Sequence, residues 1–247
     1  MKITGISNSL SGSSAGAPLL KDDDTRGNFR DPKVRAAFAF YVSLFQRGLA
    51  PTLANTQISN VYQEIALGRY AMYVTGPWNL GEFRRRLGDS MSGAWSTSPM
   101  PGPSGAASGT SIPGGSSLVI FRGRGHDDRR RLDAAWQLVE YLSAPASQLA
   151  FYEASGDLPA REAAWRDPKL SGDPKAAAFL AQLRRVTPVP RVPEWELIAS
   201  RIAQAVERAA RGATPIDGAL AALDHEVDQI LEKRRWLMAR TAAGGDR

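Results

Sequence analysis

The sequence predicts an α/β protein that is rich in helix and contains a short mixed sheet. Apolar residues recur at helical spacing towards both ends of the 247-residue chain, between capping residues and glycines. Between them lie three short β-prone segments, residues 70–75, 93–97 and 117–121. The chain has the length of one large or two modest domains, which is enough to bury a substantial core.

The first predicted helix begins at Asp31-Pro32, a capping residue followed by proline at the first helical position. Its apolar stripe ends at Gly48 and consists of Val34, Ala37, Phe38, Tyr41 and Phe45. A second helix is expected over 57–67, followed by a buried strand over 70–75. The turn Gly76-Pro77 then leads into a short helix that carries Trp78, Leu80, Phe83 and Leu87.

Residues Ser90 to Phe121 contain no Asp, Glu, Lys or Arg. The window holds the predicted strands at 93–97 and 117–121 and a loop over 99–115 that is rich in Pro, Gly and Ser. Two interpretations stay open: a long loop between strands of a sheet, or the uncharged lining of a cleft.

The second half is predicted to be helical. Helices are expected over 132–142, 145–155, 160–166 and 173–185, then an extended stretch at Thr187–Pro193 because each proline disfavours helix in its predecessor. Two long helices close the chain, one running from Trp195 to Gly212 and one opening at Thr214-Pro215. We expect residues 1–16 to be a disordered or remnant segment, 17–237 to form the folded portion, and 238–247 to be a polar tail.

Composition narrows the functional classes. The 31 basic and 25 acidic residues give a net charge of +6, but the arginine runs at 84–86 and 129–131 are flanked by acidic residues, which favours solvated helix faces over a nucleic-acid surface. The absence of cysteine excludes disulfides and thiolate sites. No apolar run approaches the ~18 residues of a membrane-spanning helix.

Enzyme motifs are absent: the chain has no P-loop, dinucleotide-binding glycines, nucleophile elbow or zinc-protease helix. His126 and His225 are expected at the surface, and Asp22-Asp23-Asp24 lacks the spacing of a calcium loop and is expected to be a solvated acidic turn. We therefore predict no catalytic residues, metal site or cofactor. A glycosidase with paired carboxylates is the enzyme alternative.

Tryptophans that follow helix-breaking turns are the strongest candidates for ligand contacts. Trp78 follows the predicted strand 70–75, where ligands bind in open α/β sheets, and its indole would stack on a sugar ring or else fill the core. Gly114-Gly115 permits positive φ and close approach of a ligand, or is a plain turn. Trp195, beside Glu194, also opens a helix. The other tryptophans are expected to be packing residues: Trp95, Trp136, Trp165 and Trp236.

Five segments, in order, resemble the maltose-binding-like extracellular solute-binding proteins of ABC sugar transporters, and the resemblance runs from about Gly16 to Trp236. The segments are 62–79 (YQEIALGRYAMYVTGPWN), 100–103 (MPGP), 114–120 (GGSSLVI), 134–143 (AAWQLVEYLS) and 156–161 (GDLPAR).

The resemblance implies a periplasmic-binding-protein-like (type II) lobe and two α/β lobes that close on a ligand. It assigns ligand contacts to Trp78, Gly114, Gly115 and Trp195, and adds Arg161 and Glu194. It covers about the C-terminal three fifths of a typical member, without an export signal or most of the first lobe, which implies an incomplete two-lobe architecture.

The sequence thus predicts the substrate-binding subunit, in its C-terminal portion, of an ABC importer. It would bind a mono- or oligosaccharide by aromatic stacking and hydrogen bonds in the periplasm or outside the cell, and deliver it to membrane permease subunits, its only link to the membrane. The alternatives are a lobe that no longer binds solute, and a binder of a non-sugar polyol or a glycerol-phosphate-type ligand. The uncharged segment 90–121 disfavours an anionic ligand.

Overall fold

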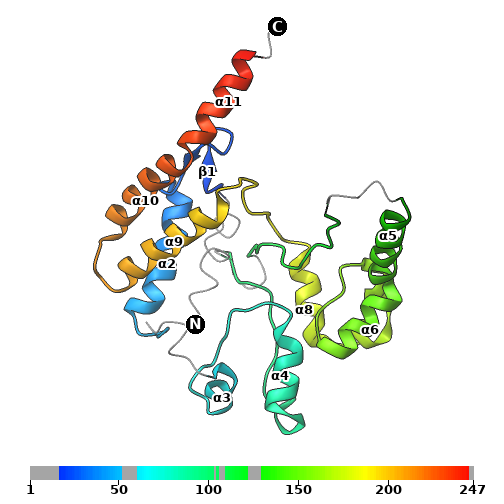
Figure 1. Ribbon diagram of the computed structural model, residues 1–247. Coiled ribbons are helices and arrows are strands. Elements are labelled where there is room, and N and C mark those ends of the chain that lie inside the picture. Colours follow the sequence, from blue (N-terminus) through cyan, green and yellow to red (C-terminus); the bar gives the residue numbers. More distant parts are fainter. Residues whose placement is uncertain (1–16, 52–59, 103, 106–108, 122–128, 245–247) are drawn as a thin grey trace.

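The computed structural model describes residues 17–51, 60–102, 104–105, 109–121 and 129–244. The described elements, in chain order, are β1 Leu20–Lys21, β2 Arg26–Gly27, α2 Pro32–Gln46, α3 Val61–Ala66, α4 Asn79–Leu87, η3 Asp89–Met91, α5 Arg129–Ser143, α6 Pro145–Ser155, η4 Glu162–Arg166, α7 Pro168–Ser171, α8 Pro174–Leu183, α9 Trp195–Ala210, α10 Ile216–Ile230 and α11 Glu232–Gly244. Figure 1 shows α2, α9 and α10 packed together, α5, α6 and α8 in a second group, and α11 extending away from both.

Residues 17–50 and 192–231, here called the terminal region, share one hydrophobic core. Helix α2 begins as predicted, because the Asp31 carboxylate accepts hydrogen bonds from the amides of Lys33 (2.8 Å) and Val34 (3.4 Å). Its apolar face packs against α9 and α10, which contribute most of their own apolar residues to the same core. The largest fully buried side chains of this core are Phe29, Phe38, Ile198, Ile202, Leu220, Leu223 and Leu231.

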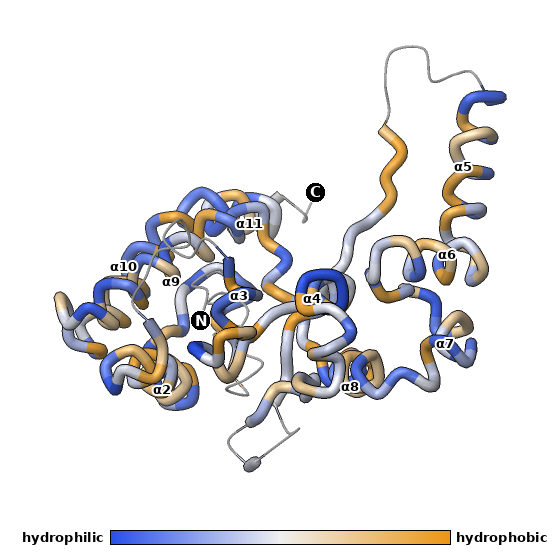
Figure 2. The backbone as a smooth tube through the Cα atoms, turned by 90° about the horizontal axis from the view of Figure 1, so that it is seen from below, coloured by the Kyte–Doolittle hydropathy of each residue, from blue (hydrophilic) through white to orange (hydrophobic). Residues whose placement is uncertain are grey.

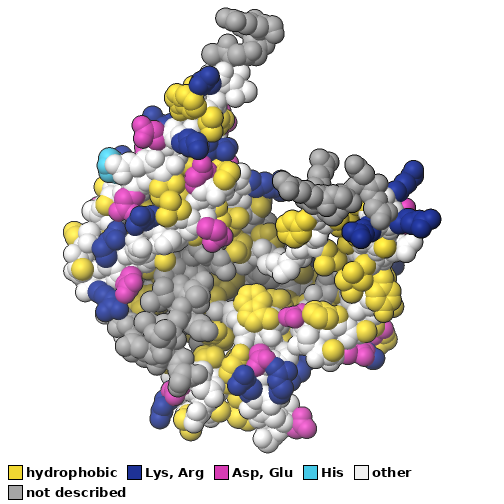
Figure 3. All heavy atoms as spheres, in the orientation of Figure 1, with side chains coloured by type: hydrophobic (Ala, Val, Ile, Leu, Met, Phe, Trp, Pro, Cys, Tyr) yellow, Lys and Arg dark blue, Asp and Glu magenta, His cyan; other side chains and the backbone are white. Residues whose placement is uncertain are grey.

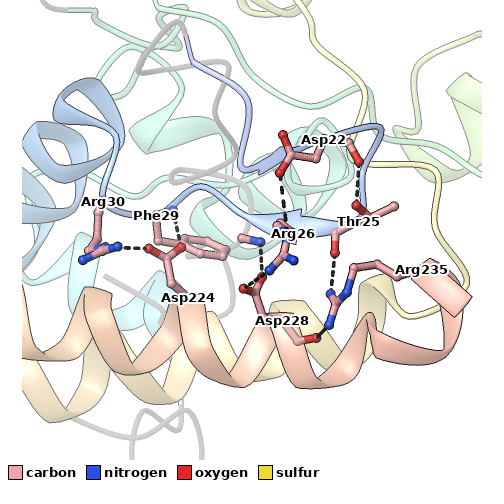
Figure 4. Close-up of polar contacts among 9 residues, drawn as sticks. Asp22, Thr25, Arg26, Phe29, Arg30, Asp224, Asp228 and Arg235 are labelled. Carbon is pink, nitrogen blue, oxygen red and sulfur yellow. Dashed lines mark hydrogen bonds and ion pairs between the residues drawn. The ribbon is translucent and has the colours of Figure 1, made fainter.

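A two-stranded hairpin covers one side of α10. Strands β1 and β2 pair antiparallel, with Leu20 opposite Gly27, around the turn Asp22–Asp24, in which all three residues have positive φ. Helix α10 holds the hairpin through carboxylates: Asp228 accepts from the Gly27 amide (2.9 Å) and Asp224 from the Phe29 amide (2.8 Å), as Figure 4 shows. The acidic turn is solvated, as predicted, and it joins two strands that the sequence did not indicate.

Residues 60–185, here called the central region, have a smaller core formed by Leu80, Tyr152, Trp165, Leu170 and Ala176. Helix α4 crosses the end of α6 very closely. A Cβ at Gly81 would lie 2.5 Å from the Ser155 carbonyl oxygen, and one at Gly156 would lie 2.6 Å from the Gly81 Cα. Two glycines therefore set the distance between these helices. Gly156, with φ +83°, also ends α6 where the sequence predicted.

The predicted strands at 70–75, 93–97 and 117–121 do not form, so the short sheet is the antiparallel hairpin alone among the described residues rather than a mixed sheet. The prediction of a buried strand at 70–75 is wrong, since Met72 is 85% exposed. Figure 2 shows the hydrophobic stretch before the grey loop that leads to α5 as a single extended segment. β-Prone sequence needs a partner to pair with, and no described strand lies alongside.

Helix α5 carries the predicted apolar stripe, yet it buries none of its residues. Trp165 and the half-buried Trp95 pack in the central region as expected, whereas Trp136 and Trp236 are exposed, so the packing role predicted for these two is wrong. Helix α11 continues to Gly244, beyond the residue at which a polar tail was predicted. The predictions for residues 1–16, 57–59 and His126 lie outside the described residues.

Candidate functional site

Trp78 stands at the start of α4 with its side chain 53% exposed. The indole folds back over Gly76, so that a Cβ at this glycine would overlap carbon atoms of the six-membered ring. Pro77 between them restricts the backbone. The Gly-Pro-Trp sequence therefore supports a particular placement of the ring, with glycine required beneath it.

Asn79, which follows directly, is buried to 5% exposure and was not singled out from the sequence. Its side-chain amide donates to the Thr75 hydroxyl, and its amide oxygen accepts from the Tyr62 hydroxyl at 2.6 Å. The Asn79 backbone amide donates to the Gly76 carbonyl at 3.2 Å. A closed set of hydrogen bonds thus surrounds the turn that carries Trp78.

Tyr62 belongs to an aromatic cluster beneath this turn. Its ring meets Phe83 edge-on with centroids 5.2 Å apart, and Phe83 lies 5.1 Å from Trp95. The Arg86 guanidinium lies 4.9 Å from the Tyr62 centroid. Burial, together with the Glu82 carboxylate, raises the pKa of the Tyr62 hydroxyl above its ordinary value.

Gly114 and Gly115 lie in an exposed extended stretch, with no atom within 4 Å of where a Cβ would stand. Gly115 has φ +104°, which agrees with the predicted backbone freedom. Just before them, Ser111 pairs with the 185–187 segment: its amide donates to the Arg185 carbonyl at 3.1 Å and its carbonyl accepts from the Thr187 amide at 2.8 Å. This pairing ties the glycines to the stretch that leads into α9.

Glu194 and Trp195 form the start of α9. Trp195 is half-buried and packs against the core of the terminal region. One carboxylate oxygen of Glu194, Oε2, is buried and has no hydrogen-bond partner among the described residues. A buried acceptor without a partner is costly, so Glu194 is available to a hydroxyl or amide donor.

Arg161 has a structural partner. Its Nε donates to the Ser143 carbonyl at the end of α5 (3.2 Å), and its backbone amide donates to the Gln148 side chain (2.9 Å). In the described parts of the chain, no hydrogen bond, ion pair or ring contact joins Trp78, Gly114 and Trp195 to one another. Figure 3 shows hydrophobic side chains gathered around the hollowed middle of the face between the α9–α10 side and the α5–α6 side.

A separate polar cluster links α4, α6 and α8. The Arg84 guanidinium donates to the Tyr152 hydroxyl (3.1 Å) and to the Asp173 carboxylate, which also accepts from Tyr152 (3.0 Å). A surface pocket of about 380 Å³ beside it is lined by residues that include Gly81, Arg84, Tyr152 and Gly156, and by none of the predicted ligand contacts. The contacts of this cluster connect α4, α6 and the start of α8, so they stabilise the packing of these helices.

Two classes of site find no support in the described ranges. They contain no group of three or more His, Cys, Asp or Glu side chains able to hold a metal ion. No described helix combines the length and the apolar character that crossing a membrane requires.

Comparison with known proteins identifies relatives along nearly the whole chain. Binding proteins of Brucella abortus and Brucella suis are 23% identical over 225 residues, which is 89% of this chain and 51% of theirs. The chain thus spans about half the length of these curated relatives.

Solved structures share the type II periplasmic-binding-protein fold. The sugar-binding protein MalE from Xanthomonas citri is 44% identical with a TM-score of 0.86, covering 97% of this chain and 59% of that one. An ABC transporter solute-binding protein from Thermotoga lettingae, bound with α-D-tagatose, is 24% identical with a TM-score of 0.74, covering 93% and 56%. The family described as bacterial extracellular solute-binding protein matches residues 3–178, and this chain belongs to that family.

Proposed function

We propose that this chain binds a mono- or oligosaccharide for an ABC importer, with Trp78 as the stacking surface. The observation that carries the proposal is the half-exposed indole, braced over Gly76 at the first turn of α4. An exposed aromatic ring that is held rigid offers the apolar face of a sugar a surface at little entropic cost. Likeness to the sugar-binding protein of Xanthomonas citri supports the same ligand class.

The remaining contacts are part of the proposal. Gly114 and Gly115 present bare backbone, whose amide and carbonyl groups suit sugar hydroxyls. Trp195 and the unpaired Glu194 Oε2 offer a second aromatic face and a hydrogen-bond acceptor at the start of α9. Arg161 contributes through α5, whose end it caps. The ligand is released to permease subunits, in the periplasm or outside the cell, and no chemical step is involved.

A titration tests the proposal. Intrinsic tryptophan fluorescence and calorimetry are followed against glucose, maltose, maltotriose and D-tagatose, with glycerol 3-phosphate as the anionic comparison. We expect a saturable response to at least one sugar, and Trp78→Ala should weaken it by at least about tenfold, the usual cost of removing an aromatic anchor.

Trp236→Ala is the matched control, because Trp236 is 55% exposed and Trp78 is 53% exposed. The control should leave the affinity unchanged. No saturable response across the sugars would overturn sugar binding by this chain and favour a lobe that no longer binds solute. Equal losses in the two variants would overturn the assignment to Trp78.

A further inference from the structure

Asn79 combines two features that rarely occur together: a fully polar side chain with 5% exposure, next to a half-exposed tryptophan. Thr25 is the other buried polar residue in the described ranges, and it lies in the hairpin of the terminal region. Replacing a buried, hydrogen-bonded amide by an apolar residue of the same shape can leave the stability of a protein unchanged. A buried amide is therefore expected where its hydrogen bonds hold the chain in a particular geometry. The Asn79 amide is therefore best understood through the turn at residues 76–78 that its hydrogen bonds close.

We infer that Asn79 is the positioning residue of the Trp78 site, and that its side-chain amide fixes the orientation in which the indole meets a ligand. The inference rests on the proposed function for the ligand itself. It goes beyond that function because it assigns a role to a buried residue outside the proposed ligand contacts.

The first step is that the hydrogen bonds of Asn79 close a ring around Gly76, Pro77 and Trp78. The side-chain amide donates back to the Thr75 hydroxyl, at the residue before the turn. The Asn79 backbone amide donates to the Gly76 carbonyl at 3.2 Å. Asn79 therefore joins the end of the turn to Thr75 and Gly76 at its start.

The second step is that α4 begins without a side-chain cap from its N-cap residue. Trp78 occupies the N-cap position and makes no side-chain hydrogen bond to the helix. Ser, Thr, Asp or Asn at that position usually accepts from the first helical amides and fixes the chain entry. Here Asn79, at the first helical position, fixes the entry from within the helix.

The third step is that the clamp is anchored to a rigid support. Tyr62 donates to the Asn79 amide oxygen at 2.6 Å, and its own ring is held by Phe83 and by the Arg86 guanidinium. The indole has no such packing on its exposed face and follows the backbone of the turn over Gly76. Loss of the clamp therefore releases the indole while the aromatic cluster below stays in place.

The expected consequence is a loss of preorganisation. A ring that samples several orientations must be ordered by the ligand, which weakens binding without removing a contact. We expect Asn79→Leu, which keeps the branching at Cγ but has no amide, to weaken sugar binding by about 3- to 30-fold. Tyr62→Phe and Thr75→Val each remove one of the two side-chain bonds and should have smaller effects in the same direction.

The test measures the order and the solvent exposure of the Trp78 indole directly. Near-ultraviolet circular dichroism and acrylamide quenching are compared for the wild type and Asn79→Leu, and again for both in a Trp78→Phe background. We expect Asn79→Leu to lower the dichroic signal and to raise quenching, and we expect both changes to vanish when Trp78 is replaced. Leu170→Ala is the control for plain destabilisation, since Leu170 is buried in the core of the central region; it should lower the melting temperature and leave the Trp78 signal intact.

An unchanged Trp78 signal in folded Asn79→Leu would overturn the inference, and so would a change that persists in the Trp78→Phe background. If Asn79→Leu does not fold, Tyr62→Phe and Thr75→Val decide the matter by the same readouts. The spectroscopic result does not need a ligand. A wild-type chain that binds no sugar therefore contradicts the proposed function, whereas an insensitive indole contradicts the positioning role.

Discussion

The terminal and central regions both contain amphipathic helices, yet they differ in how far these helices are buried. In the terminal region α2, α9 and α10 bury their apolar faces against one another, and Ile198, Leu223 and Val227 have 0% exposure. In the central region α5 buries no residue, and Phe121 on the neighbouring segment is 80% exposed. The difference lies in whether a partner is present, since both regions carry apolar stripes at helical spacing.

The partners in the terminal region come from far along the chain. The Phe29 amide and the Asp224 carboxylate, 195 residues apart in sequence, meet at 2.8 Å and hold the hairpin on α10. Long-range bonds of the central region span shorter stretches of chain, such as the 89 residues between Arg84 and Asp173. This region carries Trp78, Gly114 and Gly115, three of the residues proposed for ligand contact. A surface that binds must stay exposed. Of the proposed contacts, the exposed Trp78, Gly114 and Gly115 lie in the central region, whereas the half-buried Glu194 and Trp195 lie in the terminal region.

The largest expected effect on stability distinguishes the buried helices of the terminal region from the exposed helix α5. Ile198→Ala removes a fully buried side chain between α9 and its neighbours and should lower the free energy of unfolding by about 2–5 kcal/mol. Leu138→Ala on α5, where the side chain is 57% exposed, should change it by about 0.5 kcal/mol or less. Chemical denaturation measures both, and similar losses would contradict the contrast between the regions.

A second comparison uses one glycine from each region, each near the start of its helix. Gly81→Ala in α4 forces a Cβ to within 2.5 Å of the Ser155 carbonyl oxygen and should cost about 1–3 kcal/mol. Gly218→Ala in α10 would make ordinary contacts with the Thr214 methyl at 3.5 Å and the Pro215 ring at 3.9 Å, and should stabilise the protein by about 0.5–1 kcal/mol. Melting temperatures should shift in opposite directions, and shifts of the same sign would mean that α4 and α6 are not held as closely as described.

A third prediction concerns the stability of the protein at acidic pH. Burial would raise the pKa of Asp173, but the hydrogen bond and charge of Arg84, together with the Lys175 amide and Tyr152, outweigh it and hold that pKa below its ordinary value. The unfolded carboxyl binds its proton first as pH falls, so the contribution is complete above about pH 4 and disappears as pH falls through the lower folded pKa.

Asp173→Asn isolates this charge, since asparagine still caps α8. The variant should lose about 1 kcal/mol at pH 7, a modest figure because Arg84 is 42% exposed and partly screened. Unfolding free energies from pH 7 to pH 2 should show the gap between the two proteins closing at the acid end. A gap that is constant with pH would rule out a charge effect.

Local signals in the sequence predicted the helices well, and the sheet poorly. Asp31-Pro32 and Gly156 mark helix ends that depend on nearby atoms, and both were predicted correctly. The segment 70–75 is β-prone, but a strand depends on a distant partner that propensity does not specify. The hairpin was missed for the same reason, because its strands are two residues long and are held from α10.

The candidate site was predictable to a similar extent. The Gly-Pro-Trp motif indicated an aromatic ring at the start of a helix, and Trp78 is there and exposed. Asn79 was missed because a polar residue in a first helical turn is usually solvated, and its burial depends on Tyr62, 17 residues earlier. Arg161 was assigned to ligand contact by resemblance alone, and its guanidinium donates to the Ser143 carbonyl at the end of α5, a contact that the sequence did not indicate.

The smallest expected effect on stability comes from the exposed apolar segment of the central region. Phe121→Ser should change the free energy of unfolding by about 0.5 kcal/mol or less, because the ring is already in contact with water. The same substitution should lower the fluorescence of 8-anilinonaphthalene-1-sulfonate bound to the native protein, since this dye reports exposed apolar surface. A destabilisation of 2 kcal/mol or more, as expected for a core residue, would mean that residues 117–121 are buried in solution. It would contradict the contrast between the two regions at its most exposed segment.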